Sequence, residues 1–258
     1  MTKIYYFSGT GNTLWSARKL ADLIGGECEL FNIGVEAQKE AIKISASAVI
    51  LLFPSYAYGL PILVRRFAQK AMFDAPYIAA FVTYGTSPGG TLAELCRILK
   101  KKRINSAFFG NIPSVENYIA IFGPQKAKTI ERRIGMQKQA TEIAAKVIKE
   151  KKTNRINTFR PFSSFISFLF SLGLATFYKS YRVSPDCNAC GICERICPVA
   201  AITIQNSKPV FHKNCEHCQA CLNWCPKCAI HFGRLNSKTP RYHHPEISIA
   251  DISRSVSD

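Results

Sequence analysis

Nine of the eleven cysteines in this chain of 258 residues lie between Cys187 and Cys228. They form two runs with the spacing Cys-x2-Cys-x2-Cys-x3-Cys-Pro, and the second run follows the first at a distance of 28 positions. The repeat extends past the cysteines, because Ala201-Ile202 in the first copy corresponds to Ala229-Ile230 in the second. A duplicated run of this kind predicts a unit with internal twofold pseudosymmetry.

Thiolates at this spacing are typical ligands of iron–sulfur clusters. Three cysteines at i, i+3 and i+6 let one short loop reach three irons of a [4Fe–4S] cube, and the cysteine before proline reaches the cube of the other run. Zinc is the alternative, since paired cysteines also suit tetrahedral zinc, but zinc requires neither the third cysteine nor the Cys-Pro ending. The predicted ligands are Cys187, Cys190, Cys193 and Cys225 for one cluster, and Cys215, Cys218, Cys221 and Cys197 for the other.

Residues 185–232 therefore resemble a bacterial ferredoxin with two [4Fe–4S] clusters, a small α+β domain that we place at 183–233. Cys228 is a rival to Cys225 as fourth ligand. In the repeat it corresponds to Ala200, a small packing position, which favours Cys225. Since each cysteine set is complete, nearby histidines are expected beside the clusters or at the surface rather than as ligands; they are His212, His217 and His231.

A second chemical motif lies near the N-terminus, where a predicted strand at 3–7 and a predicted helix at 14–24 enclose a loop of glycines, hydroxyls and an amide. Backbone N–H groups at a helix N-terminus bind phosphate without a cationic side chain. The loop is no dinucleotide fingerprint, which needs glycine at position 14, and no Walker A loop, which needs Gly-Lys-Ser/Thr. Its residues are Ser8, Gly9, Thr10, Gly11, Asn12 and Thr13.

This arrangement resembles the start of a flavodoxin, whose first loop has the pattern Ser/Thr-x-Thr-Gly-x-Thr and holds the phosphate of FMN. Two further loops support the resemblance, because they follow predicted strands at 48–53 and 77–83. In a doubly wound parallel sheet of order 2-1-3-4-5, all three loops meet at one edge. Glycine lets the backbone approach a flat ring, and tyrosine stacks on it. The FMN contacts expected here are Pro54, Ser55, Tyr56, Ala57, Tyr58, Gly59, Tyr84 and Gly85.

The α/β domain predicted in this way covers residues 1–152. Cys28 and Cys96 are isolated in sequence, and we predict both as small buried residues, since a lone cysteine usually behaves as a hydrophobe. The remaining elements of the domain are predicted as a helix at 92–100, a fifth strand at 106–110 and a long amphipathic helix at 126–151.

Residues 161–178 carry no charge over eighteen positions, a length at the threshold of a membrane span. Ser164, Ser167 and Ser171 recur at helical spacing and make one face weakly polar. A span would also place the flavin and the clusters on opposite sides of a membrane. Within a linker at 153–182 we therefore favour a helix packed between the domains; a surface-lying or partner-docking helix and a span are the alternatives.

The net charge of +17 is concentrated in residues 99–182, which carry seventeen basic and four acidic side chains. Such charge favours an acidic redox partner or an anionic membrane surface. Nucleic acid is disfavoured, because basic runs such as 100–103 fit exposed helix ends. Cysteines spaced for iron, and no export signal after Met1, predict a reducing cytoplasm, with peripheral membrane contact through 161–178 as an addition.

The order of the segments, ending in a polar tail at 234–258 that contains Arg-Tyr-His-His-Pro, resembles flavodoxin–ferredoxin fusion proteins over nearly the whole chain. The resemblance implies an electron carrier with FMN and two [4Fe–4S] clusters that converts between two-electron and one-electron transfer. No catalytic acid, base or nucleophile is evident, so a carrier is favoured over a substrate-specific enzyme. The alternatives are a flavin-dependent reductase of a quinone or other small acceptor, and a membrane-docked subunit of a larger complex.

Overall fold

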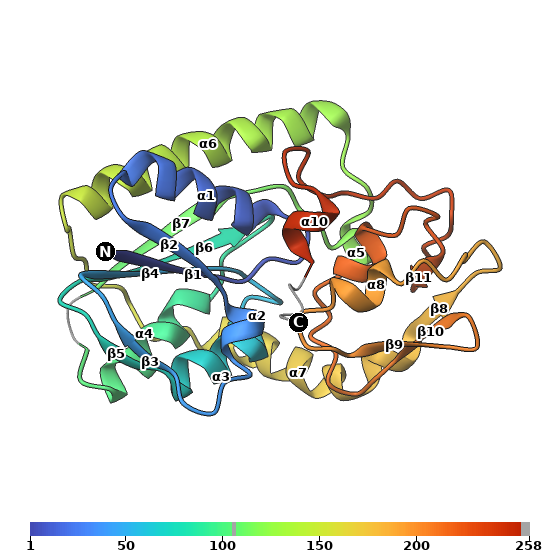
Figure 1. The fold of residues 1–258 in the computed structure, drawn as a ribbon, viewed down its shortest axis with the longest axis horizontal. Coiled ribbons are helices and arrows are strands. Elements are labelled where there is room, and N and C mark those ends of the chain that lie inside the picture. Colours follow the sequence, from blue (N-terminus) through green and yellow to red (C-terminus); the bar gives the residue numbers. More distant parts are fainter. Residues whose placement is uncertain (105–106, 254–258) are drawn as a thin grey trace.

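The structure, a computed structural model, describes residues 1–104 and 107–253. A five-stranded parallel sheet of order β2-β1-β4-β6-β7 forms the centre of the larger part (Figure 1). This order confirms the predicted doubly wound fold, with the switch point beside β1, where the chain crosses from β2 to β4. The strands are β1 (Thr2–Tyr6), β2 (Cys28–Asn32), β4 (Ala48–Pro54), β6 (Ile78–Tyr84) and β7 (Phe108–Pro113).

Helices cover both faces of this sheet, which is why β4 and β6 are continuous apolar runs. The helices α1 (Asn12–Ile24) and α6 (Ala127–Lys149) lie on one face, and α3 (Ile62–Lys70) and α4 (Thr91–Lys101) on the other (Figure 1).

Most of the predicted elements in this part occur within a few residues of their expected positions. The fifth strand begins later than expected, at Phe108, and Ser106 lies outside the described residues. Cys96 is buried as predicted, whereas Cys28 is partly exposed at the edge strand β2, so that expectation was wrong. The short elements are α2 (Ile33–Glu36), α5 (Ile119–Phe122) and a parallel pair, β3 (Lys43–Ser45) with β5 (Met72–Asp74), which the sequence did not predict.

The smaller part is an α+β unit with two short antiparallel sheets, and its two halves repeat one another in structure as well as in sequence. The helix α8 (Ile192–Arg195) and the helix α9 (Ala220–Asn223) occupy equivalent repeat positions. Left-handed backbone recurs in the same way, with φ of 50° at Ala200 and 47° at Cys228. The strands are β8 (Tyr181–Val183) paired with β11 (Ile230–Phe232), and β9 (Ile202–Gln205) paired with β10 (Lys208–Phe211).

The two parts share one apolar core, in which Trp224 and Ile247 pack in the same cluster as Phe7. The helix α7 (Pro161–Phe177) runs along the side of the molecule that carries α3 and α4 and continues through a 3-10 turn (Tyr178–Ser180) into β8 (Figure 1). The tail returns to the first part, where α10 (Ile249–Ile252) is tied to α1 by an ion pair of 2.6 Å between Arg18 and Asp251. No helix among the described residues is long and apolar enough to cross a membrane.

Candidate functional site

The loop at 8–13 connects β1 to α1 at the switch point of the sheet. Gly11 takes φ 95°, a left-handed conformation that glycine adopts without strain, and so turns the chain into the helix. Its N–H donates to Ser8 Oγ at 3.2 Å, and Thr13 Oγ1 lies 2.7 Å from Thr83 Oγ1. Thr10, Thr13 and the start of α1 are buried. The loop is therefore held rigidly, with the first amides of α1 beside it.

The loops after four strands meet at a cavity of about 20 Å³ next to this turn. Its lining includes residues after β7, which the sequence analysis did not select, although a fifth strand at the same edge was a usable signal. The lining residues predicted from sequence are Ser8, Gly9, Thr10, Asn12, Thr13, Pro54, Tyr56, Tyr84 and Gly85; the additional ones are Thr83, Ser114, Val115 and Asn117.

Two predicted contacts lie elsewhere. Ser55 Oγ is engaged with Thr91 Oγ1 at 2.8 Å, on the side of α4, and Gly59 is bonded through its backbone to Tyr56. Ala57 and Tyr58 line a second, larger cavity rather than the small one.

This larger cavity, of about 460 Å³, adjoins the first and is shared by both parts of the molecule. Tyr56 lines both cavities, and its buried hydroxyl has no hydrogen-bond partner among the described residues. Burial first, and then the nearby groups Cys218, Glu216 and Cys215, raise the pKa of this hydroxyl, so it stays a neutral hydrogen-bond donor near pH 7. The remaining walls are the loops at 85–87 and 116–118, the helices α5 and α7, and residues 217–219.

His217, which the sequence placed beside the clusters, is one of these wall residues. Its Nε2 lies 2.8 Å from Tyr118 Oη and its Nδ1 lies 3.0 Å from Tyr181 Oη. Burial lowers its pKa to about 4, so the imidazole is neutral near pH 7. The ring packs 4.5 Å from that of Phe232 and 5.3 Å from that of Phe177. His217 thus joins the cavity to the cysteine unit.

Direct contacts join the phosphate-type loop to the second cysteine run. Trp224 Nε1 donates to the carbonyl of Gly9 at 3.0 Å. A Cβ added at Gly9 would lie 2.7 Å from the carbonyl oxygen of Cys218, so only glycine permits this approach.

The C-terminal tail also contacts the loop at 8–13. His244 donates its backbone N–H to the carbonyl of Thr10 at 2.8 Å and stacks on Trp15 with ring centroids 5.0 Å apart. Tyr242 Oη donates to Asn12 Oδ1 at 2.7 Å, and burial raises its pKa. The sequence analysis assigned none of these tail residues to the loop at 8–13, although the aromatic and histidine content of the tail was a usable signal.

The structure places cysteines of the first run beside cysteines of the second. One small cavity is lined by Cys187, Cys190, Cys193 and Cys225, with Lys227 at its wall. Burial first, and then the thiols of Cys190, Cys225 and Cys187, raise the pKa of Cys193 to about 12. This cavity has Cys225 in its lining, and Cys228 is absent from it.

Burial first, and then the nearby thiols of Cys215, Cys218, Cys197 and Cys193, raise the pKa of Cys221. Cys221 therefore lies near cysteines of the first run as well as its own. Backbone N–H groups support the crossed ligands at equivalent repeat positions: Ala201 donates to Cys197 Sγ at 3.1 Å, and Ala229 donates to Cys225 Sγ at 3.3 Å.

N–H···S hydrogen bonds and burial are two of the features that set the reduction potential of a protein-bound iron–sulfur cluster. Within residues 1–104 and 107–253, no group of three or more His, Cys, Asp or Glu side chains has positions suited to a metal ion. The two cluster assignments therefore stay predictions.

No family model matches the chain, and no curated protein matches it. Among solved structures, the chain is similar to the two-electron reduced flavodoxin of Megasphaera elsdenii, with 17% identity over 57% of this chain and 99% of that one and a TM-score of 0.35. It is similar to a flavodoxin of Streptococcus pneumonia TIGR4, with 18% identity over 57% and 99% and a TM-score of 0.36. A flavodoxin of Fusobacterium nucleatum bound to flavin mononucleotide gives 13% identity over 58% and 97%, with a TM-score of 0.38. The flavodoxin-like fold described above rests on the strand order.

Proposed function

We propose that this chain is an electron-transfer protein that couples FMN to two [4Fe–4S] clusters and converts between two-electron and one-electron transfer. The observation that carries the proposal is the junction at Gly9, where the phosphate-type loop contacts both Trp224 and Cys218 of the second cysteine run. A binding loop for one redox group and a ligand loop for another are thereby held in van der Waals contact.

The first part supplies the elements of an FMN site. The loop at 8–13 and the amides at the start of α1 would hold the phosphate, because the helix dipole and unpaired N–H groups favour an anion. The cavity of about 460 Å³ would take the ring system, between the loop that carries Tyr56 and the wall that carries His217. The unpartnered hydroxyl of Tyr56 would donate to a ring or ribityl acceptor.

The crossed cysteine sets would hold the clusters. When bound, these groups supply reversible one-electron steps, and FMN supplies the two-electron step. Cys218 lines the flavin cavity, so the set Cys215, Cys218, Cys221 and Cys197 is the proximal one. The other set is distal and includes the exposed Cys190. We place the order of transfer as FMN, proximal cluster, distal cluster.

The distal end is the docking point that we propose for a redox partner. Arg195 lies beside it, donating to the carbonyl of Cys190 at 3.2 Å, and Lys227 lines the same cavity. Two cations next to an exposed cluster ligand favour an acidic partner, since complementary charge raises the rate of encounter.

The apolar walls of the larger cavity favour a second function, reduction of a small lipophilic acceptor such as a quinone. Ile121 and Phe122 of α5 line it and are 66% and 48% exposed, so they form an apolar rim at its opening. Turnover with soluble quinones that saturates with concentration would favour this reductase over a carrier that reacts only with proteins.

The direct test is anaerobic purification followed by quantitation of iron, acid-labile sulfide, zinc and flavin. We expect about eight irons and one FMN per chain. Stoichiometric zinc in place of iron would contradict the cluster assignment, and a preparation that takes up iron but binds no added FMN would contradict the flavin assignment.

A further inference from the structure

The helix α7 presents a stripe of large apolar side chains to solvent. Phe162 is 74% exposed, Phe165 60%, Leu169 49% and Leu172 57%, and their spacing of three and four residues places them on one side of the helix. Phe168, 58% exposed, lies at the margin of this stripe. The opposite side of α7 packs on the molecule, where Ser167 meets Gly59 and Ser163 meets Gly90.

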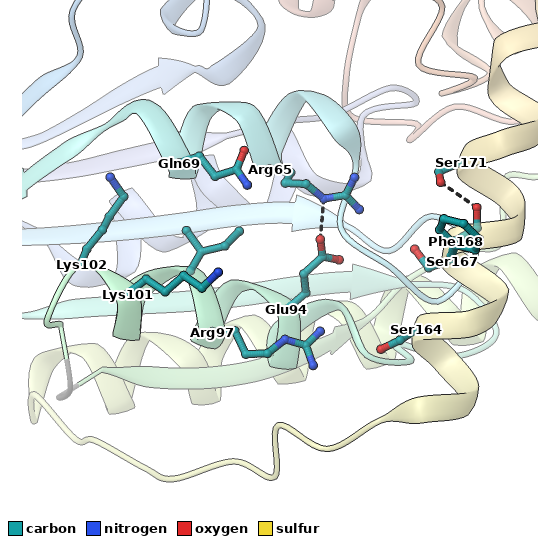
Figure 2. Close-up of a pocket in the computed structure, with 11 residues that line it drawn as sticks. Arg65, Gln69, Glu94, Arg97, Lys101, Lys102, Ser164, Ser167, Phe168 and Ser171 are labelled. Atoms are coloured by element: carbon teal, nitrogen blue, oxygen red, sulfur yellow. Dashed lines mark hydrogen bonds and ion pairs between the residues drawn. The ribbon is translucent and has the colours of Figure 1, made fainter.

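A basic groove of about 600 Å³ borders one flank of the stripe, between α3, α4 and α7. Figure 2 shows Arg65 and Arg97 projecting from α3 and α4 toward the serine face of α7. Four cations line the groove against one carboxylate, Glu94, which is already paired with Arg65. The lining cations are Arg65, Arg97, Lys101 and Lys102, and the α7 serines are Ser164, Ser167 and Ser171.

The cavity of about 460 Å³, which we propose for the flavin ring, opens along the other flank. Leu169 belongs both to the stripe and to the lining of that cavity, and the exposed Ile121 and Phe122 continue the apolar surface onto α5. One face of the molecule therefore carries, side by side, a basic groove, an aromatic stripe and the apolar mouth of a cavity.

We propose that this face docks on the surface of an anionic phospholipid bilayer. The stripe has the character of an interfacial helix, whose apolar side chains enter the boundary between headgroups and acyl chains while the helix lies in the membrane plane. The groove supplies the cations for lipid phosphates. α7 itself carries no charge, so the cations that would attract the lipid phosphates come from α3, α4 and the residue after α4.

A second copy of the chain is a poorer occupant of this face. The groove on this face carries four cations against one carboxylate, so two such faces would repel one another. A lipid surface satisfies both the cations and the exposed phenylalanines, and docking would turn the mouth of the cavity toward the membrane.

The test is co-flotation of the full chain with vesicles of phosphatidylcholine alone and of phosphatidylcholine mixed with phosphatidylglycerol. We expect binding to the mixed vesicles that weakens with salt, and little binding to neutral ones. Replacing Phe162 and Phe165 by serine should lower the partition coefficient at least tenfold. Arg97→Gln and Lys101→Gln should each lower it about fivefold.

Matched controls lie on α6, on the opposite side of the molecule from α7 (Figure 1). Ile143→Ser removes an apolar side chain that is 62% exposed, and Lys146→Gln removes an exposed charge; both should leave vesicle binding unchanged. Circular dichroism and flavin content report whether each variant is folded. Failure of the folded chain to float with anionic vesicles, or equal losses in the α6 controls, would overturn the proposal. So would a concentration-dependent dimer, or a protein complex, that the phenylalanine variants disrupt without any vesicle binding.

Discussion

The two cysteine runs share one backbone plan and differ in what surrounds it. At equal repeat positions, Cys190 is exposed and Cys218 is buried, and Arg195 is exposed where Asn223 is buried. The first run faces solvent, whereas the second is covered by the α/β domain. The duplication thus keeps the cysteine spacing and the left-handed turns in both copies, and the substitutions between the copies are what make their surroundings differ.

Several residues of the second copy that differ from their counterparts in the first copy contact the first part of the molecule. Trp224 bonds to Gly9, Asn223 Nδ2 donates to the carbonyl of Asn117 at 3.4 Å, and His217 bonds to Tyr118. The carboxyl of Glu216 receives backbone N–H groups at the start of α3, although burial dominates and raises its pKa to about 7. The corresponding pairs are Asn188 and Glu216, Ala189 and His217, Arg195 and Asn223, and Ile196 and Trp224.

The largest contrast is expected between Cys218→Ala and Cys190→Ala. Each should lower the iron content by up to about four per chain, because each removes one ligand of one cluster. Only Cys218→Ala should abolish rapid reduction of the remaining cluster by reduced flavin, measured by stopped-flow absorbance, since it removes the proximal site. Cys228→Ala is the matched control and should keep about eight irons. Equal kinetic losses in both ligand variants would contradict the order of transfer.

Trp224 supplies the next contrast. Trp224→Ala should lower the free energy of unfolding by about 3–5 kcal/mol, because the side chain is large and 4% exposed. Trp224→Phe keeps most of the apolar volume and loses the hydrogen bond to Gly9, which should cost about 1 kcal/mol. Ile196→Val at the equivalent position should cost about 1 kcal/mol and leave FMN affinity unchanged. Chemical denaturation and flavin fluorescence measure both quantities. We expect Trp224→Ala to weaken FMN binding as well. An unaltered FMN affinity would show that the loop at 8–13 does not depend on its contact with the cysteine unit.

His244 lies in the tail, where it contacts Thr10 and Trp15, and it is expected to make the stability of the protein depend on pH. Burial lowers its pKa to about 4, below the ordinary value of 6.5, so the unfolded chain binds the proton first. The contribution of His244 to stability is therefore fully present above about pH 6.5 and is lost as the pH drops toward 4, by up to about 3 kcal/mol. His244→Gln should reduce the slope of this part of the profile, measured by thermal unfolding between those pH values, and the slope that remains should include the contribution of His217, whose pKa burial also lowers to about 4. A profile unchanged in His244→Gln would show that other groups set the acid limit.

The sequence predicted the features that depend on local residue spacing. It did not predict the contacts that depend on packing between distant parts of the chain. The buried strands follow from local rules, and the observed strand order agrees with them. The cysteine spacing and the loop at 8–13 are local patterns too, and the cofactors assigned to them stay predictions. The contacts of Tyr242 and His244 with the loop at 8–13 could not be predicted, because they join residues 230 or more positions apart. The exposure of Cys28 follows from its place on an edge strand, which the local apolar pattern did not reveal.

The smallest expected effect concerns the cations beside the first cysteine run, whose Cys190 is exposed. Arg195→Gln and Lys227→Gln should each slow electron transfer to a small acidic redox protein about two- to fivefold at low salt, because they lie beside the distal ligands and act on the rate of encounter. The difference should vanish at high salt, where such attraction is screened. Transfer from flavin to the proposed proximal cluster should be unchanged, since neither cation lines the cavity of about 460 Å³ in which we propose the flavin ring. Lys146→Gln on α6 matches the charge change at a distance. If it slowed the reaction equally, net charge alone would account for the steering, and the exposed cysteine run would have no special place in docking.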